Sequence, residues 1–221
     1  MTVKKVFLLI LALAIYGFSY SHVIPKIETE IVPLSALELF WEYFHLGFLH
    51  VIPRGFDHIL FILGILLLNN SWRPVLLQCS VFTLAHSITL AFCASGLIIP
   101  NTKWVEVVIA LSIVIIAVEN IFQQKMNNWG LVIIFIFGLI HGMGFANALK
   151  ELGLPANYFW SSLIAFNVGV EMAQISILLI AWFGLVNWIK TKDWYFQRFA
   201  IPMSICIGII ALYWLIGRMM G

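Results

Sequence analysis

The chain has 221 residues, of which 62% are hydrophobic and 10% are charged, whereas about 25% of the residues of a soluble domain are charged. This composition, with a mean hydropathy of +1.02, excludes a soluble globular protein, a disordered chain and a disulfide-rich secreted scaffold. The formal charge of +2 provides no basic surface for nucleic acid, so we expect no nucleic-acid partner. Because backbone groups in lipid need internal hydrogen-bond partners, the sequence predicts an all-α integral membrane protein.

The N-terminus has the pattern of a secretory signal peptide over residues 1–21. Lys4 and Lys5 form the charged region, an apolar stretch follows, and Ser19 and Ser21 are the small residues before a cleavage site. An uncleaved first helix that anchors the chain is the alternative. Cleavage would leave the mature N-terminus on the extracytoplasmic side of a bacterial inner (cytoplasmic) membrane, which is the compartment we expect.

Residues 22–50 form the second predicted unit, an extracytoplasmic segment that ends in an amphipathic helix over Leu34–His50. Aromatic and leucine side chains recur at helical spacing on one face of this helix, and Glu38, Glu42 and His45 lie along another. Because two carboxylates fall in so short a segment, we expect this helix to lie in the outer membrane interface. Its acidic face would concentrate cations outside the membrane.

Residues 51–221 form the third predicted unit, a transmembrane domain of about six helices. A helix needs about 20 mostly apolar residues to cross a bilayer, and most of the apolar runs approach that length. Lys and Arg are evenly divided between the loops of the two sides, so the positive-inside rule gives no orientation and the signal peptide decides it. The predicted spans are Gly55–Leu68, Val75–Ile99, Val105–Phe122, Gly130–Leu149, Phe159–Ile189 and Phe199–Gly217.

Several ionisable side chains interrupt these apolar runs. Each costs about 2.5–3.5 kcal/mol on insertion scales and is a functional candidate by default. Imidazoles and carboxylates dominate the set, and both are ligands of divalent transition metals. The candidate metal ligands are Asp57, His58, His86, His141 and Glu171, with His50 at the mouth of the site, and the supporting polar residues are Ser87, Asn167, Gln174, Glu119 and Asn120.

The spacing of the candidates within their helices predicts that they face the interior of the bundle. Around His86 and His141 the chain reads Phe-Thr-Leu-Ala-His and Phe-Gly-Leu-Ile-His. Gly138 and Gly142, beside His141, permit close helix approach. A single helical stripe, polar at four of its five positions, runs along the second span and consists of Cys79, Thr83, His86, Leu90 and Cys93.

Several motifs of the chain resemble those of the HupE/UreJ family. They are HVIPRGFDHILF at 50–61, FTLAHSITL at 82–90, Glu119-Asn120, FGLIHGMGFA at 137–146 and FNVGVEMAQ at 166–174. The resemblance extends from about Leu46 to the C-terminus and implies a nickel or cobalt permease tied to hydrogenase and urease maturation. It also assigns to His50, Asp57 and His58 the histidine-then-Asp-His signature of nickel–cobalt transporters, with six residues between His50 and Asp57 where five are expected.

The sequence leaves three functions open. The first is a permease for Ni²⁺ or Co²⁺ as substrate, driven by an ion gradient or the membrane potential. The second is an intramembrane Zn²⁺-dependent hydrolase, in which three histidines and Asp57 hold the ion and Glu171 is the general base. The third is a membrane metal chaperone that does not transport. Candidate partners are the lipid bilayer, the metal ion, metalloenzyme maturation proteins and further copies of the chain in a homo-oligomer.

Overall fold

The computed structural model describes residues 35–69, 71–123, 129–145, 149 and 154–220, and the elements in these ranges are all helical. The predicted signal peptide over residues 1–21 and the start of the second unit lie outside the described residues. The main helices are α2 (Ala36–Val51), α3 (Phe56–Leu68), α4 (Trp72–Ala94), α5 (Thr102–Phe122), α6 (Gly130–Gly144), α8 (Phe159–Ala181) and α10 (Ile201–Met220). Shorter helical segments are η1 (Ala156–Tyr158), η2 (Trp182–Val186), α9 (Asn187–Ile189) and η3 (Phe196–Ala200).

Four continuous helical stretches of the described chain are long and apolar enough to cross a membrane: Trp72–Ala94, Thr102–Phe122, Ala156–Ile189 and Phe196–Met220. Helices α2 and α3 together make a fifth candidate, a pair bent by 66° at the break between them. Helix α6 is apolar but shorter, at 15 residues. The chain is therefore a multi-pass, all-α membrane protein, and the count of six spans stays a prediction.

Helix α4 ends five residues earlier than predicted, at Ala94 rather than Ile99. A Schellman motif terminates it: Gly96 has a φ of 79°, and the amide of Leu97 donates to the carbonyl of Phe92 at 3.0 Å. Glycine adopts this left-handed conformation without the penalty that a Cβ would add. The three apolar residues that follow are exposed loop, which hydropathy alone assigned to the span.

Helix α2 packs against α8 along its length, and its position in the outer membrane interface stays a prediction. Glycines bring the two backbones together, because a Cβ on Gly47 would overlap the backbone of Phe166 and one on Gly169 that of Phe44. Tyr43 is buried in this contact, while Glu38 and His45 face outward. The small residues on both helices therefore make α2 part of the bundle.

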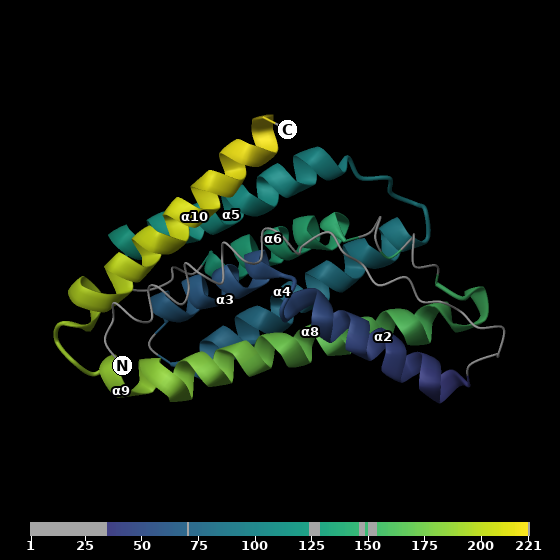
Figure 1. Ribbon diagram of the computed structural model, residues 1–221, viewed down its shortest axis with the longest axis horizontal. Coiled ribbons are helices and arrows are strands. Elements are labelled where there is room, and N and C mark those ends of the chain that lie inside the picture. The colour runs from purple at the N-terminus through teal and green to yellow at the C-terminus, as the bar shows by residue number, and fades with distance from the viewer. Residues whose placement is uncertain (1–34, 70, 124–128, 146–148, 150–153, 221) are drawn as a thin grey trace.

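The helices lie in three groups (Figure 1): α5 and α10 side by side on one edge, α8 and α2 on the other, and α3, α4 and α6 between them. Helices α4 and α6 approach closely, because a Cβ on Gly138 would lie 2.6 Å from the Phe82 carbonyl oxygen and one on Gly142 would overlap the backbone of His86. This confirms the close approach predicted from the glycines. The register, 138 with 82 and 142 with 86, shows that the two helices run parallel.

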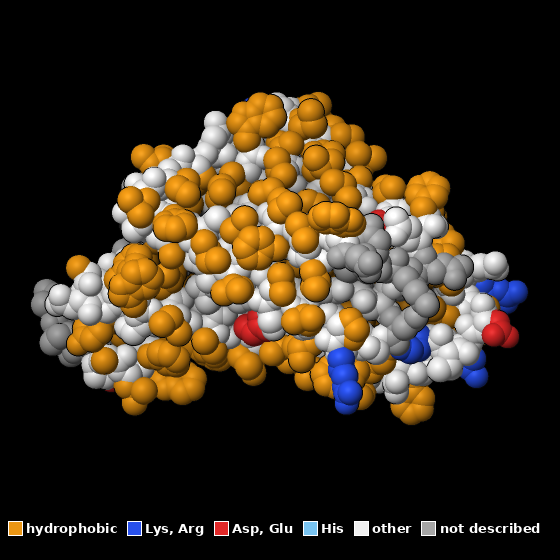
Figure 2. Space-filling model, turned by 180° about the vertical axis from the view of Figure 1, so that it is seen from behind, with side chains coloured by type: hydrophobic (Ala, Val, Ile, Leu, Met, Phe, Trp, Pro, Cys, Tyr) orange, Lys and Arg blue, Asp and Glu red, His pale blue; other side chains and the backbone are white. Residues whose placement is uncertain are grey.

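The outer surface of the bundle is apolar. Figure 2 shows hydrophobic side chains spread widely over one face, with few charged side chains among them. On α4, Leu84 and Ile88 are exposed, as a lipid-facing side requires. The predicted stripe on the other side of α4 is confirmed, because all five of its members are buried: Cys79, Thr83, His86, Leu90 and Cys93.

Candidate metal centre

The break between α2 and α3 places two histidines near each other. His50 lies in the last turn of α2 and His58 in the first turn of α3. The connecting turn needs Gly55, since a Cβ there would lie 2.5 Å from the His50 carbonyl oxygen and 3.1 Å from His58 Nδ1. The carbonyl end of α2 favours a cation nearby, and Asp57 offsets the positive N-terminus of α3.

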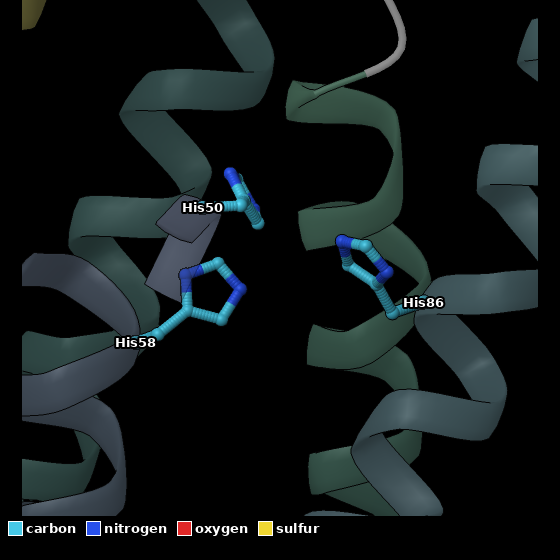
Figure 3. Close-up of side chains that lie close together, drawn as sticks. All are labelled: His50, His58 and His86. Atoms are coloured by element: carbon cyan, nitrogen blue, oxygen red, sulfur yellow. The ribbon is translucent and has the colours of Figure 1, made fainter. Parts of the chain in front are cut away.

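A third histidine, His86 of α4, completes a group of three (Figure 3). One ring nitrogen from each of His50, His58 and His86 lies within 4.8 Å of the others. Two nitrogens bound to one ion at about 2.1 Å each can be at most about 4.2 Å apart. If each ring nitrogen moved by less than about 1 Å, all three could therefore bind a single transition-metal ion.

His141 of α6 lies beside this group. Its ring centroid is 5.3 Å from that of His58 and 4.8 Å from that of Phe82. Both His86 and His141 are buried, at 0% and 2% exposure, so neither faces lipid. The structure thus brings together His50, His58 and His86, with His141 against His58 on the α6 side.

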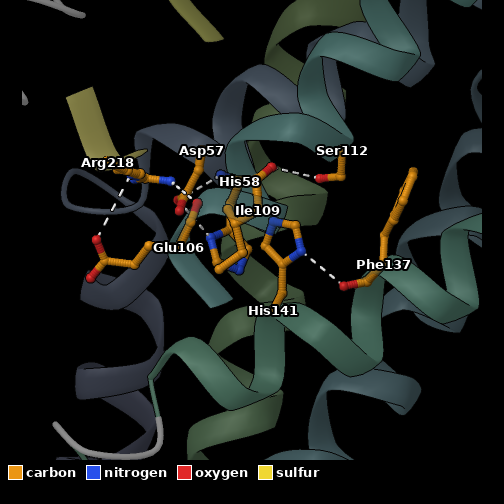
Figure 4. Close-up of polar contacts among 8 residues, drawn as sticks. All are labelled: Asp57, His58, Glu106, Ile109, Ser112, Phe137, His141 and Arg218. Atoms are coloured by element: carbon orange, nitrogen blue, oxygen red, sulfur yellow. Dashed lines mark hydrogen bonds and ion pairs between the residues drawn. The ribbon is translucent and has the colours of Figure 1, made fainter. Parts of the chain in front are cut away.

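Three of the four imidazoles are held through Nδ1. His58 Nδ1 lies 3.1 Å from Asp57 Oδ1, and His141 Nδ1 lies 2.9 Å from the Phe137 carbonyl oxygen (Figure 4). Because a carbonyl can only accept, His141 Nδ1 carries the proton of the neutral ring and Nε2 keeps its lone pair. The same reasoning applies to His58, whose partner is a carboxylate. Such outer contacts fix the tautomer and orientation of metal-binding histidines.

His86 is held in the same way from α8. Its Nδ1 lies 3.4 Å from Asn167 Oδ1, and the Asn167 amide group donates to the Leu163 carbonyl at 2.8 Å. That second bond turns the amide oxygen toward the imidazole, so His86 Nδ1 is the donor and its Nε2 lone pair is free. Asn167 therefore orients the His86 ring.

The Nε2 nitrogens of all four rings have no hydrogen-bond partner. The Nε2 atoms of His50, His58, His86 and His141 are all buried and unpartnered. Buried polar atoms are nearly always hydrogen-bonded, and leaving one unsatisfied costs about 1–3 kcal/mol. Four unpartnered ring nitrogens in adjoining imidazoles fit the donor set of a divalent transition metal, for which neutral imidazole is a preferred ligand.

Glu171 lies apart from the imidazoles. Its Oε1 accepts a hydrogen bond from Ser80 Oγ of α4 at 2.7 Å, and it is one helical turn beyond Asn167 on α8. Gln174 Oε1 accepts from Thr83 Oγ1 at 3.2 Å. The two side chains thus pair with hydroxyls of α4 and extend the polar contact away from the histidines.

Three supporting candidates lie elsewhere. Ser87 donates to the Thr83 carbonyl of its own helix at 2.6 Å, one residue round the helix from His86. The Asn120 amide donates to the Gly64 carbonyl at 2.9 Å and to Ser204 Oγ at 3.1 Å, so it joins α5 to α3 and α10. Glu119 is half-buried beside it. The structure does not bring these three residues to the histidines.

Several residues near the site were missed in the sequence. The Phe145 ring lies 4.0 Å from that of His50 between centroids. Ser80, which donates to Glu171, is exposed on the side of α4 that carries Leu84, so the buried stripe did not indicate it. At the end of α10, Arg218 donates to the Glu106 carbonyl at 2.9 Å and lies near Asp57 (Figure 4). Only the folding of α10 against α5 places this charge there.

The chain belongs to the HupE/UreJ family, since residues 27–218, nearly the whole chain, match the family described as HupE / UreJ protein. No curated protein and no solved structure matches the chain. The match confirms the resemblance seen in the motifs and includes all four histidines of the centre. It associates the chain with nickel and cobalt handling at a membrane.

Proposed function

We propose that the protein is a membrane permease for a divalent transition-metal ion, with Ni²⁺ or Co²⁺ as its substrate. The observation that carries this proposal is the set of four adjoining imidazoles whose buried Nε2 atoms lack partners. Three of them are already within 4.8 Å of one another. The family match supports the same metals.

The ligand types support a site that both binds and releases an ion. Imidazole nitrogen suits nickel, cobalt and zinc, while the affinity of any such site rises toward copper. A conducting site must bind strongly enough to replace water yet weakly enough to let the ion leave. Neutral imidazoles, with Asp57 bonded to His58 rather than added as a further ligand, meet this requirement better than a cluster of carboxylates or thiolates.

The centre lies close to one end of the bundle. His86 is eight residues before the end of α4, or about 12 Å along the helix, and His58 is in the first turn of α3. In the orientation predicted from the signal peptide, this is the extracytoplasmic end. We therefore propose that the ion reaches the histidines from outside a bacterial inner membrane.

The geometry gives less support to a hydrolase. A general base must lie within hydrogen-bond reach of a metal-bound water, but Glu171 is bonded to Ser80, two turns of α4 from His86. Ser87 is bonded to its own helix. A metal chaperone would need the same histidines as a permease, and only ion movement separates the two.

Metal flux into liposomes that contain the purified protein tests the proposal. We expect saturable uptake of Ni²⁺ or Co²⁺ and its loss in His86→Ala. His45→Ala, an exposed histidine of α2, is the matched control and should transport normally. Binding without uptake would replace the permease with a chaperone. Uptake by His86→Ala at the wild-type rate would remove the histidine centre from the transport path.

A further inference from the structure

A row of polar contacts leads away from the histidines between α4 and α8. The first contact is His86 with Asn167 at 3.4 Å, the second is Thr83 with Gln174 at 3.2 Å, and the third is Ser80 with Glu171 at 2.7 Å. On α4 the three positions are three residues apart, and His86 and Thr83 are buried whereas Ser80 lies at the exposed edge of the contact. At 1.5 Å per residue, the row extends about 9 Å from His86 toward the far end of α4.

The last member of this row, Glu171, has a free ligand atom. Its Oε1 accepts from Ser80, while its Oε2 is buried and has no hydrogen-bond partner. Neither of the two ion pairs found in the described residues involves Glu171. A carboxylate inside a membrane span is costly unless it has a function or a partner, and Glu171 presents an unshared oxygen to a cation.

A packing gap too narrow for a water molecule lies between His58 and the side chains of Cys79 and Gln174. His58 lines one part of it and Cys79 and Gln174 line another, with Phe61, Ile65 and Phe82 between them. Cys79 lies close enough to Glu171 to interact with it electrostatically. An imidazole and a sulfur atom, both ligand types of transition-metal ions, thus lie on either side of a short apolar stretch.

We propose that Glu171, held by Ser80, is a second binding site for the transported cation, separate from the histidine centre. Besides the Ser80 hydroxyl, the Cys79 thiol lies near it, and Gln174 follows about one helical turn further along α8. This inference rests on the proposed function, because the second site receives the ion that the histidines release. Conduction through several sites requires that an ion can leave each of them. A second, weaker site would allow the ion to leave the tighter histidine centre stepwise.

The two sites should differ in strength. Three or four imidazole nitrogens converge in the histidine centre, whereas the second site offers one carboxylate and neutral ligands. We expect the wild-type protein to bind two Ni²⁺ ions, one tightly and one weakly. Glu171→Gln should remove the weak ion, keep the tight one and abolish uptake at normal expression.

Calorimetric titration of the full-length protein with Ni²⁺ tests this assignment. Ser80→Ala should weaken the second ion by about tenfold, since it removes an outer-shell contact. Glu119→Gln removes another half-buried carboxylate of a span and should still bind two ions. If Glu171→Gln unfolds, Glu171→Asp, which keeps the charge on a shorter arm, should bind the second ion more weakly while the first is unchanged.

The outcomes separate this inference from the proposed function. Binding of one ion by the wild type, or of two by Glu171→Gln, overturns the second site and leaves the histidine centre intact. Loss of both ions in Glu171→Gln also overturns it, because Glu171 would then belong to the first site. If His86→Ala binds the tight ion as the wild type does, the proposed function itself fails.

Discussion

Two buried polar regions of this bundle use their hydrogen-bonding groups differently. Asn120 directs both donor bonds of its amide to other helices, to Gly64 of α3 and Ser204 of α10. By contrast, His58 and His141 are held by groups of their own helices, Asp57 and the Phe137 carbonyl. The Asn120 bonds join helices. The histidine bonds orient the rings and leave the second ring nitrogens free to bind a ligand.

The two regions also differ in how their unpartnered polar atoms are grouped. Asn120 Oδ1 is also buried without a partner, but it belongs to no group of candidate ligands in the described part of the chain. The four histidine Nε2 atoms adjoin one another. One unsatisfied atom is a small cost of a structural contact, whereas several together indicate a binding site.

The largest expected effect comes from comparing two alanine variants, one in each region. His58→Ala should weaken Ni²⁺ binding by more than about 100-fold, because it removes a ligand rather than an outer contact, and should leave thermal stability near that of the wild type. Asn120→Ala should do the reverse. It should lower the free energy of unfolding by about 1 kcal/mol, the size of an interhelical polar contact in membranes, with an unchanged Kd.

Calorimetry and thermal unfolding in the same detergent measure both quantities. A wild-type Kd in His58→Ala would contradict the division between binding and structural contacts. So would a large loss of metal affinity in correctly folded Asn120→Ala.

The next effect concerns the contact that orients His58. Asp57→Asn keeps an acceptor oxygen beside Nδ1 but removes the charge that makes the imidazole a better ligand. We expect Ni²⁺ affinity to fall by about 10–100-fold, as for other outer-shell ligands. Asp193→Asn, an exposed aspartate after α9, should bind as the wild type does. Equal affinities in the two variants would show that Asp57 only caps α3.

Proton competition gives a third, moderate effect. An imidazole must be neutral to bind a metal, and its unperturbed pKa is about 6.5. Protons therefore displace the ion as the pH falls, and Ni²⁺ affinity should weaken by at least about tenfold between pH 7.5 and pH 5.5. Calorimetry at the two pH values measures the change, and His86→Ala and His141→Ala should each flatten it. A wild-type affinity independent of pH would argue against imidazole ligands.

The smallest effect is electrostatic. Arg218 lies within electrostatic range of Asp57 and His141, and its positive charge opposes a cation in the centre. Arg218→Gln should strengthen Ni²⁺ binding by about threefold at low salt, and this gain should shrink at high salt because ions screen exposed charges. Titrations at two salt concentrations measure it. Weaker binding in this variant would mean that Arg218 supports the site through its contact with Glu106.

Much of this protein could be predicted from the sequence. Composition determined the membrane class, because so much apolar surface needs a lipid environment. Helical spacing identified the buried face of α4, and the motifs identified the family. The rarity of ionisable residues in spans identified His50, His58, His86 and His141 as candidate ligands.

Only the tertiary structure decided which of these residues meet. Periodicity predicts which face of a helix is buried. It does not predict the axial register or the rotation of that helix against its neighbour. The contact of Ser80 with Glu171 therefore could not be inferred across the 91 positions between them. The same limit applies to α2. Only the packed structure shows that Gly47 and Gly169 allow the backbones of α2 and α8 to come together. Local sequence fixes which groups are available, whereas packing between distant helices fixes which lone pairs converge on a site.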